Sequence, residues 1–250
     1  MEAQVRALVV SDLHSNAAAL RAVFSRVRRK RYDEIVCLGD FVGYGAEPNQ
    51  VLDAMRTARG RKLYIRGNHD RVAAGLDDAA AFNAPAREAA FWNRDHLSGP
   101  NRRFIEKLPV GPLAHDGVML CHGSPADEDE YVFTIPHAAQ IFEMFDAPII
   151  LYGHTHLPVI FSIDRNGEVT GTLVRGETTW RLEPDRRYLI NPGSVGQPRD
   201  RDPDASFAIV DTIRRTASFF RVEYAIEKTR EAILRAGLPR ILADRLRVGT

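Results

Sequence analysis

The sequence has few cysteines and no long apolar run, and both shortages narrow the classes of protein it can encode. Cys37 and Cys121 are the only cysteines among 250 residues, and each lies in a short apolar run. This placement predicts buried, reduced thiols and implies no disulfide framework. No apolar stretch approaches the ~20 residues of a membrane-spanning helix, and no charged leader with an apolar core precedes the first apolar run. We therefore expect a cytoplasmic protein with no membrane partner.

Net charge is also nearly absent. The 34 basic and 33 acidic residues leave a formal charge of +1, whereas a dedicated nucleic-acid-binding protein usually carries a clear basic excess. The basic run at 26–31 is typical of the polar end of a helix. We therefore expect no nucleic-acid partner and a small molecule as the ligand, while the composition leaves a homo-oligomer open.

Short apolar runs alternate with helical spacing in the first part of the chain. Strands are expected at Val5–Val10, Glu34–Leu38 and Lys62–Ile65, and helices at Ala17–Arg29 and Pro48–Arg59. This repeated order predicts right-handed βαβ units and a parallel sheet.

The sequence pattern changes in the rest of the chain. A helical region is expected from about Ala79 to Leu108, followed by short strands separated by turn residues and by two short helices after Glu227. The strands are expected at 118–121, 149–152, 159–163, 170–174, 188–190, 207–211 and 217–224, with a hairpin turn at 164–167. No internal repeat or linker is visible, which predicts one domain over residues 1–250 that contains two sheets.

Five of the expected strands end in residues that can bind metal ions. These residues are Asp12 and His14; Asp40; Asn68, His69 and Asp70; His122; and His154 and His156. Each group alone could be an ordinary turn or polar loop. In α/β sheets, however, ligands bind beyond the carboxyl ends of the strands. Five such ends with ligand-type residues therefore predict one metal site rather than five turns.

The residue types restrict the metal. Imidazole nitrogens combined with carboxylate and amide oxygens, without thiolates, suit manganese, iron, nickel, cobalt or zinc, and we expect manganese first. Seven ligands exceed the four that a single zinc ion takes. They suit two ions that share one carboxylate, as in hydrolases that act by in-line displacement at phosphorus.

The series Asp-Leu-His, Gly-Asp, Gly-Asn-His-Asp, His-Gly and Gly-His-Thr-His, between Asp12 and His156, resembles the calcineurin-like metallophosphoesterase superfamily in order and approximate spacing. The later segment 191–200 is similar to small bacterial and archaeal phosphodiesterases of the YfcE type. The resemblance implies an α/β fold, namely a four-layer α/β/β/α sandwich of two mixed sheets flanked by helices.

Carried over to this sequence, the resemblance implies two triads of metal ligands bridged by Asp40. The first triad is Asp12, His14 and His156, and the second is Asn68, His122 and His154. The resemblance also implies that His69 is catalytic, because its counterpart faces the scissile phosphate and protonates the leaving oxygen or stabilises charge there. Asp70 either orients His69 or caps the local turn.

The chain departs from the family pattern in two places. Ser/Thr protein phosphatases continue after Gly-Asp with Asp-Arg-Gly, whereas Phe-Val-Gly-Tyr follows Asp40 here. The acid and the arginine of that element are missing, which argues against a protein phosphatase. Many relatives also have glycine after the first histidine, where Ser15 and Asn16 stand here.

Three residues are therefore candidate substrate contacts, each with a structural alternative. Asn16 could reach the cleft or cap a helix, and Tyr44 could reach the cleft or pack. Arg199 could bind a distal phosphate or be a solvated charge in a tight connection.

The expected function is metal-dependent hydrolysis of small phosphodiesters or phosphomonoesters by a hydroxide that bridges the two ions. A dinucleoside polyphosphate hydrolase and a protein phosphatase are alternatives within the same chemistry. A binding protein on a degenerate phosphoesterase fold is disfavoured, because every expected position is filled. A nuclease subunit is disfavoured by the near-neutral charge.

Overall fold

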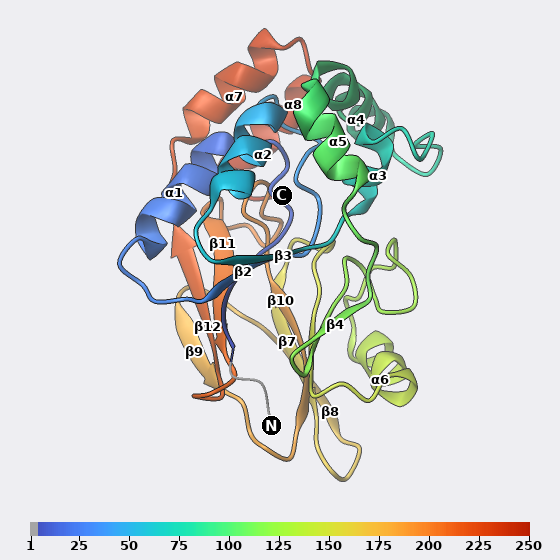
Figure 1. Cartoon of the computed structure of the whole chain (residues 1–250), viewed down its shortest axis with the longest axis vertical. Coiled ribbons are helices and arrows are strands. Elements are labelled where there is room, and N and C mark those ends of the chain that lie inside the picture. Colours follow the sequence, from blue (N-terminus) through green and yellow to red (C-terminus); the bar gives the residue numbers. More distant parts are fainter. Residues whose placement is uncertain (1–4) are drawn as a thin grey trace.

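The computed structural model describes residues 5–250, and its framework is two six-stranded mixed sheets (Figure 1). The first sheet has the order β3 (Arg61–Tyr64), β2 (Glu34–Cys37), β1 (Arg6–Val10), β11 (Ala205–Asp211), β12 (Thr216–Val222) and β9 (Thr178–Arg181). The second has the order β4 (Leu113–His115), β5 (Val118–Leu120), β6 (Ile149–Leu151), β10 (Arg187–Pro192), β7 (Pro158–Ile163) and β8 (Val169–Leu173).

Helices cover the outer faces of both sheets (Figure 1). They are α1 (Ala17–Val27), α2 (Pro48–Thr57), α3 (Asn68–Ala73), α4 (Ala84–His96), α5 (Gly99–Glu106), α6 (Ile135–Met144), α7 (Ile226–Arg235) and α8 (Arg240–Asp244), followed by a 3₁₀ turn at Arg245–Arg247. The expected sandwich of two mixed sheets flanked by helices is confirmed.

Strand β1 shows how the sequence builds the two inner layers. It pairs in parallel with β2 and antiparallel with β11. Side chains alternate along a strand, so Leu8 and Val10 pack under the helices while Ala7 and Val9 face the second sheet. All four are buried, which explains the continuous apolar run of a strand covered on both faces.

The second sheet is covered by α6, which lies on its outer side (Figure 1). Ile141 and Phe142 of this helix pack with Tyr152 and Phe161 from the sheet side. Strands β5 and β6 run parallel to each other. Together with β1, β2 and β3 they lead into the five loops that carry the polar groups. Among residues 5–250 we find no helix with the length and apolarity needed to cross a membrane.

The helical region expected between Ala79 and Leu108 is two helices, α4 and α5, rather than one. Ser98 separates them, and its hydroxyl accepts a hydrogen bond from the backbone N–H of Asn101. This N-cap, with Pro100 in the first turn, starts a new helix instead of continuing the old one. The two short C-terminal helices and the turn at 164–167 are confirmed, and Gly167 has φ +82°.

Four elements have no counterpart in the sequence-based expectation, namely α3, α6, β4 and β9. Helix α3 begins inside the Gly-Asn-His-Asp group, whose residues favour turns. It is capped by the Asp70 carboxylate, which accepts a hydrogen bond from the backbone N–H of Gly67 at 3.0 Å. A cap of this kind depends on tertiary placement as well as on the sequence of the turn.

Candidate metal centre

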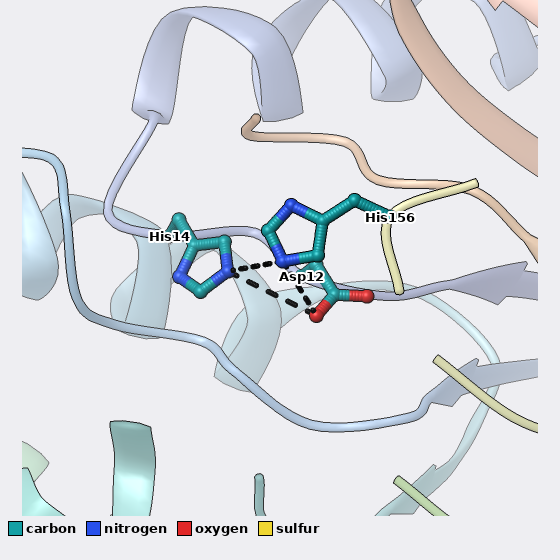
Figure 2. Close-up of side chains that lie close together, drawn as sticks. All are labelled: Asp12, His14 and His156. Atoms are coloured by element: carbon teal, nitrogen blue, oxygen red, sulfur yellow. Dashed lines mark hydrogen bonds and ion pairs between the residues drawn. The ribbon is translucent and has the colours of Figure 1, made fainter. Parts of the chain in front are cut away.

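The loops after β1 and β6 bring Asp12, His14 and His156 together. Figure 2 shows their side chains pointing toward one another. Nε2 of His14 lies 3.1 Å from Nε2 of His156. Oδ1 of Asp12 lies 3.3 Å from Nε2 of His156 and 3.8 Å from Nε2 of His14. All three side chains are buried. The first expected triad therefore exists as a compact group of ligand atoms.

A second group forms from the loops after β3, β5 and β6. Nε2 of His122 lies 3.1 Å from Oδ1 of Asn68 and 3.2 Å from Nδ1 of His154. These three residues are buried as well. They are the residues that the family resemblance assigns to the second ion, although the ligand assignment itself stays a prediction.

Asp40, in the loop after β2, lies between the two groups. Its Oδ2 is 3.6 Å from Nε2 of His14 in the first triad and 3.4 Å from Nε2 of His122 in the second. Its other oxygen, Oδ1, accepts a hydrogen bond from the backbone N–H of His69 at 2.9 Å. This is the position that a bridging carboxylate requires.

Every histidine of the two triads is held by a backbone carbonyl at one ring nitrogen. The pairs are Nδ1 of His14 with Val42 O at 3.0 Å, Nδ1 of His122 with Leu38 O at 2.7 Å, Nδ1 of His156 with Gln197 O at 2.6 Å, and Nε2 of His154 with Asp129 O at 3.1 Å. A carbonyl only accepts, so these nitrogens carry the hydrogen. The other nitrogen of each ring is thereby directed to the centre, as in metal-binding histidines generally.

This arrangement fits divalent cations. His14 and His156 are both neutral near pH 7, so their inward nitrogens face each other with lone pair against lone pair. Oδ1 of Asp12 is buried and has no hydrogen-bond partner among residues 5–250. A buried carboxylate oxygen beside facing nitrogen lone pairs is costly unless a cation or a proton lies between them. Mixed nitrogen and oxygen donors suit the first-row metals named above.

The backbone around the centre is strained. Asp12, His14, Asp40, His154 and His156 have φ between +45° and +63°, a region that costs non-glycine residues about 1 kcal/mol or more each. Five of the seven predicted ligands thus adopt a conformation that is uncommon for their residue types. Strain of this kind persists where the surrounding structure enforces it, and it is concentrated at functional sites.

Gly67 shows how closely the backbone approaches the centre. A Cβ at this position would lie 2.2 Å from Oδ1 of Asp40 and 2.7 Å from Cε1 of His122. Only a glycine leaves room for both side chains at this point.

We therefore expect Gly67→Ala to lower the free energy of unfolding by about 2 kcal/mol through overpacking and to weaken metal binding. Gly99→Ala is the matched control, because Gly99 has a neighbour no nearer than 3.4 Å, and it should change stability by less than about 0.5 kcal/mol. Chemical denaturation and metal titration of both variants measure the effects. Equal stability of the two variants would contradict the steric account.

Burial sets the protonation of most of the candidate ligand histidines. It lowers the pKa of His14 and His156 well below the usual value, and that of His154 to about 3. These rings are therefore neutral near pH 7 and able to bind a cation. Burial also lowers the pKa of His122, but the Asp40 carboxylate opposes this effect and raises it to about 10. Burial raises the pKa of Asp12 to about 7.

Metal binding near pH 7 is accordingly expected to release at least one proton, because His122 must lose its proton to bind a cation. Raising the pH removes the competing proton, so the apparent affinity should rise with pH, by up to about tenfold per unit for each proton released. Calorimetric titration of Mn²⁺ in buffers of different ionisation enthalpy counts the protons. An affinity that is unchanged between pH 6 and pH 8 would refute this expectation.

His69 lies in the wall of the cavity beside the two triads. Its ring packs against Tyr44 and Phe82 with centroid distances of 4.4 and 4.5 Å. Nδ1 is buried without a partner among residues 5–250 and lies against Gly43, which leaves Nε2 to reach a ligand. Burial lowers its pKa to about 4. The Asp70 carboxylate binds the N–H groups of Val42 and Gly67, so the structure places Asp70 at the helix cap.

The three candidate substrate contacts fall in different places. Asn16 caps α1 by accepting from the N–H of Ala19, and it is also bonded to Gly196 and Thr229. Its side chain is thus committed inside the fold. Tyr44 and Arg199 both line the cavity.

The segment 191–200 supports the loops that carry the ligands. Asn191 donates to Gly153 O and to the hydroxyl of Thr155, within the turn that carries His154 and His156. Ser194 donates to the carbonyl of Asp12. This Gly- and Pro-rich segment is therefore a rigid connection. Its hydrogen bonds hold the turns that carry residues of both triads.

Some residues of the site carried no recognisable signal in the sequence. Tyr131 lines the cavity with its ring 3.9 Å from that of His154, but it stands in an irregular segment without a motif. The four carbonyls that orient the histidines are backbone atoms, which side-chain patterns do not reveal. The cavity itself has a volume of about 170 Å³.

The chain is similar to several known proteins. Residues 5–215 match the model of the calcineurin-like phosphoesterase superfamily domain. An uncharacterized protein of Methanocaldococcus jannaschii, MJ0912, is 35% identical over 245 residues, which cover 96% of this chain and 97% of that protein.

Two solved structures resemble this one over nearly the full length of both chains. A metallophosphoesterase from Sphaerobacter thermophilus has a TM-score of 0.86 at 35% identity. The match covers 99% of this chain and 100% of that protein. The hypothetical protein PH1004 from Pyrococcus horikoshii OT3 has a TM-score of 0.80 at 20% identity, covering 98% of this chain and 99% of its own, and shows the shared fold. The family model matches most of the chain, and two relatives that are 35% identical to it match over nearly its full length. The chain therefore belongs to the calcineurin-like phosphoesterase superfamily.

Proposed function

We propose that the protein is a metal-dependent phosphoester hydrolase that holds two divalent ions, with manganese as the first choice. The observation that carries the proposal is the orientation of the four ligand histidines. A backbone carbonyl fixes one nitrogen of each ring, and the other nitrogen faces a partner across the centre. Family membership supports the class of reaction, and the position of Asp40 between the two groups of side chains supports a site for two ions.

Each residue of the centre would have one of three roles: it would hold an ion, bridge the two ions or contact the substrate. Asp12, His14 and His156 would hold one ion, Asn68, His122 and His154 the other, and Asp40 would contact both. Two ions held there would lower the pKa of a coordinated water and neutralise charge on the phosphoryl oxygens. His69, from the cavity wall, would donate a hydrogen bond to the leaving oxygen of the substrate.

The size of the cavity supports a small substrate. Its volume of about 170 Å³ lies below the roughly 300–1,000 Å³ of sites that enclose drug-sized ligands. The missing Asp-Arg-Gly element after Asp40 also argues against a protein phosphatase. We therefore favour a small phosphomonoester or phosphodiester, with a dinucleoside polyphosphate as the larger alternative and no nucleic-acid or membrane partner.

The test is an assay of purified protein after exhaustive chelation, with p-nitrophenyl phosphate and bis-p-nitrophenyl phosphate as substrates. Hydrolysis should be lost on chelation and should return when Mn²⁺ is added back. Undiminished hydrolysis by the chelated protein would refute the metal-dependent mechanism. Absence of hydrolysis in the Mn²⁺-loaded protein would favour a binding protein instead.

A further inference from the structure

Arg199 is an unneutralised cation in the wall of the cavity. Its Nη2 donates to the hydroxyl of Tyr44 at 3.2 Å and to Oε1 of Gln197 at 3.1 Å. Among residues 5–250 it forms no ion pair with a carboxylate, and its Nε is buried without a hydrogen-bond partner. A solvated surface charge, the structural alternative for this residue, does not have a buried unpaired donor. The guanidinium therefore has donor capacity that the protein itself does not use.

The other arginine of the cavity shows the contrast. Arg71 also lines it, but its guanidinium pairs with the carboxylates of Asp77, Glu128 and Asp129. Its charge is thus neutralised within the fold, where it ties the segment that carries Asp129 to α3. Arg199 is left as the cavity arginine without a counter-ion among the described residues.

Arg199 lies near two tyrosines, and each tyrosine packs beside one of the triads. The ring of Tyr44 lies 4.6 Å from that of His14 in the first triad, and the ring of Tyr131 lies 3.9 Å from that of His154 in the second. Burial raises the pKa of the Tyr131 hydroxyl, and the nearby charge of Arg199 opposes this rise. The guanidinium is therefore placed between residues that flank both triads and faces the cavity that Asp40 also lines.

We propose that Arg199, together with the hydroxyls of Tyr44 and Tyr131, binds the dianionic phosphoryl group of a phosphate monoester, and that these residues make the enzyme prefer monoesters to diesters. This inference rests on the proposed hydrolase function. It deepens that function by naming the substrate class and the residues that select it.

The chemistry of the two substrate classes explains the preference. The phosphoryl group of a monoester has three non-bridging oxygens and a charge of about −1.5 to −2 near pH 7, whereas a diester has two such oxygens and a single charge. The third charged oxygen needs a partner of its own. A guanidinium is suited to this task, because it presents several N–H donors in a fixed plane and keeps its charge.

The experiment compares p-nitrophenyl phosphate with methyl p-nitrophenyl phosphate, which share a leaving group and differ in the third charged oxygen. In the Mn²⁺-loaded protein, Arg199→Gln should lower kcat/KM for the monoester by about 30-fold and for the diester by about threefold, as expected for loss of a charge-assisted hydrogen bond. Arg199→Lys, which keeps the charge without the planar fork, should fall between the wild type and Arg199→Gln. Equal losses on both substrates would overturn the inference.

A binding measurement provides a readout that does not depend on turnover. Inorganic phosphate, titrated calorimetrically into the Mn²⁺-loaded protein at pH 8, should bind about 30-fold more weakly to Arg199→Gln. The matched control is Arg201→Gln, an exposed arginine two residues away, which should bind phosphate as the wild type does. Unchanged phosphate affinity in Arg199→Gln would overturn this inference but leave the proposed hydrolase function standing. Failure of the loaded wild type on both substrates would instead refute the hydrolase function.

Discussion

Asp40→Asn is expected to lower kcat of the Mn²⁺-loaded enzyme by at least about 10³-fold, equivalent to about 4 kcal/mol of transition-state stabilisation. The Asp40 carboxylate is the group whose oxygen lies within 3.6 Å of a histidine in each triad. Asparagine keeps the shape of the side chain but removes the negative charge that two cations would share. It also removes the charge that raises the pKa of His122. The variant should therefore lose metal as well as activity.

The measurement combines steady-state kinetics with the metal content of the purified variant. Asp146→Asn is a suitable control, because the Asp146 side chain is 98% exposed and lies before the start of β6, whereas the triad residues His154 and His156 follow its end. The control should keep wild-type metal content and rate. If Asp40→Asn hydrolysed phosphoesters at the wild-type rate, the bridging role of Asp40 would be wrong.

His69→Asn is expected to lower kcat by about 10²- to 10³-fold while metal content stays close to that of the wild type. His69 lines the cavity and lies against Tyr44 and Phe82, and the resemblance assigns it to the substrate rather than to an ion. The loss should depend on the leaving group. An alkyl phosphate needs help at its leaving oxygen, whereas p-nitrophenolate is stable as an anion, so the alkyl ester should suffer more.

A series of esters with leaving groups of increasing pKa measures this dependence. In the wild type the rate should vary weakly with leaving-group pKa, and in His69→Asn it should fall steeply. His96→Asn serves as the control, since His96 is exposed and stacked on Trp92. A uniform loss across the series, accompanied by loss of metal, would make His69 a ligand instead. That outcome has some geometric support, because His14, Asp40 and His69 also place ligand atoms within 4.8 Å of one another.

The centre could be predicted from the sequence to a large extent, because its ligands come from strand ends. An apolar run followed at once by Asp, Asn or His is visible in one sequence, and parallel strands bring their carboxyl ends to the same edge. The convergence of Asp12 and Asp40 follows from that rule, because β1 and β2 are parallel neighbours. His122 follows β5 of the second sheet, so its approach to them depends on how the two sheets pack together. The split into two triads rests on the family resemblance. The structure brings the three side chains of each triad together, and their assignment as ligands stays a prediction.

The parts that could not be predicted depend on tertiary contacts. Whether Asn16 caps a helix or reaches a ligand is decided by Gly196 and Thr229, which are distant in the sequence. The same holds for Arg199, because the lack of a counter-ion is a property of its surroundings. Helix α6, by contrast, does carry signals in the sequence, namely the N-cap Thr134, Pro136 in the first turn and the helical spacing of Ala138, Ile141 and Phe142.

The most direct test of the central claim is the anomalous scattering of manganese in crystals of the Mn²⁺-loaded protein. The dinuclear arrangement predicts two peaks about 3.5–4 Å apart, one beside Asp12, His14 and His156 and the other beside Asn68, His122 and His154, with Asp40 in contact with both. A single peak, or a pair of peaks away from Asp40, would contradict the account.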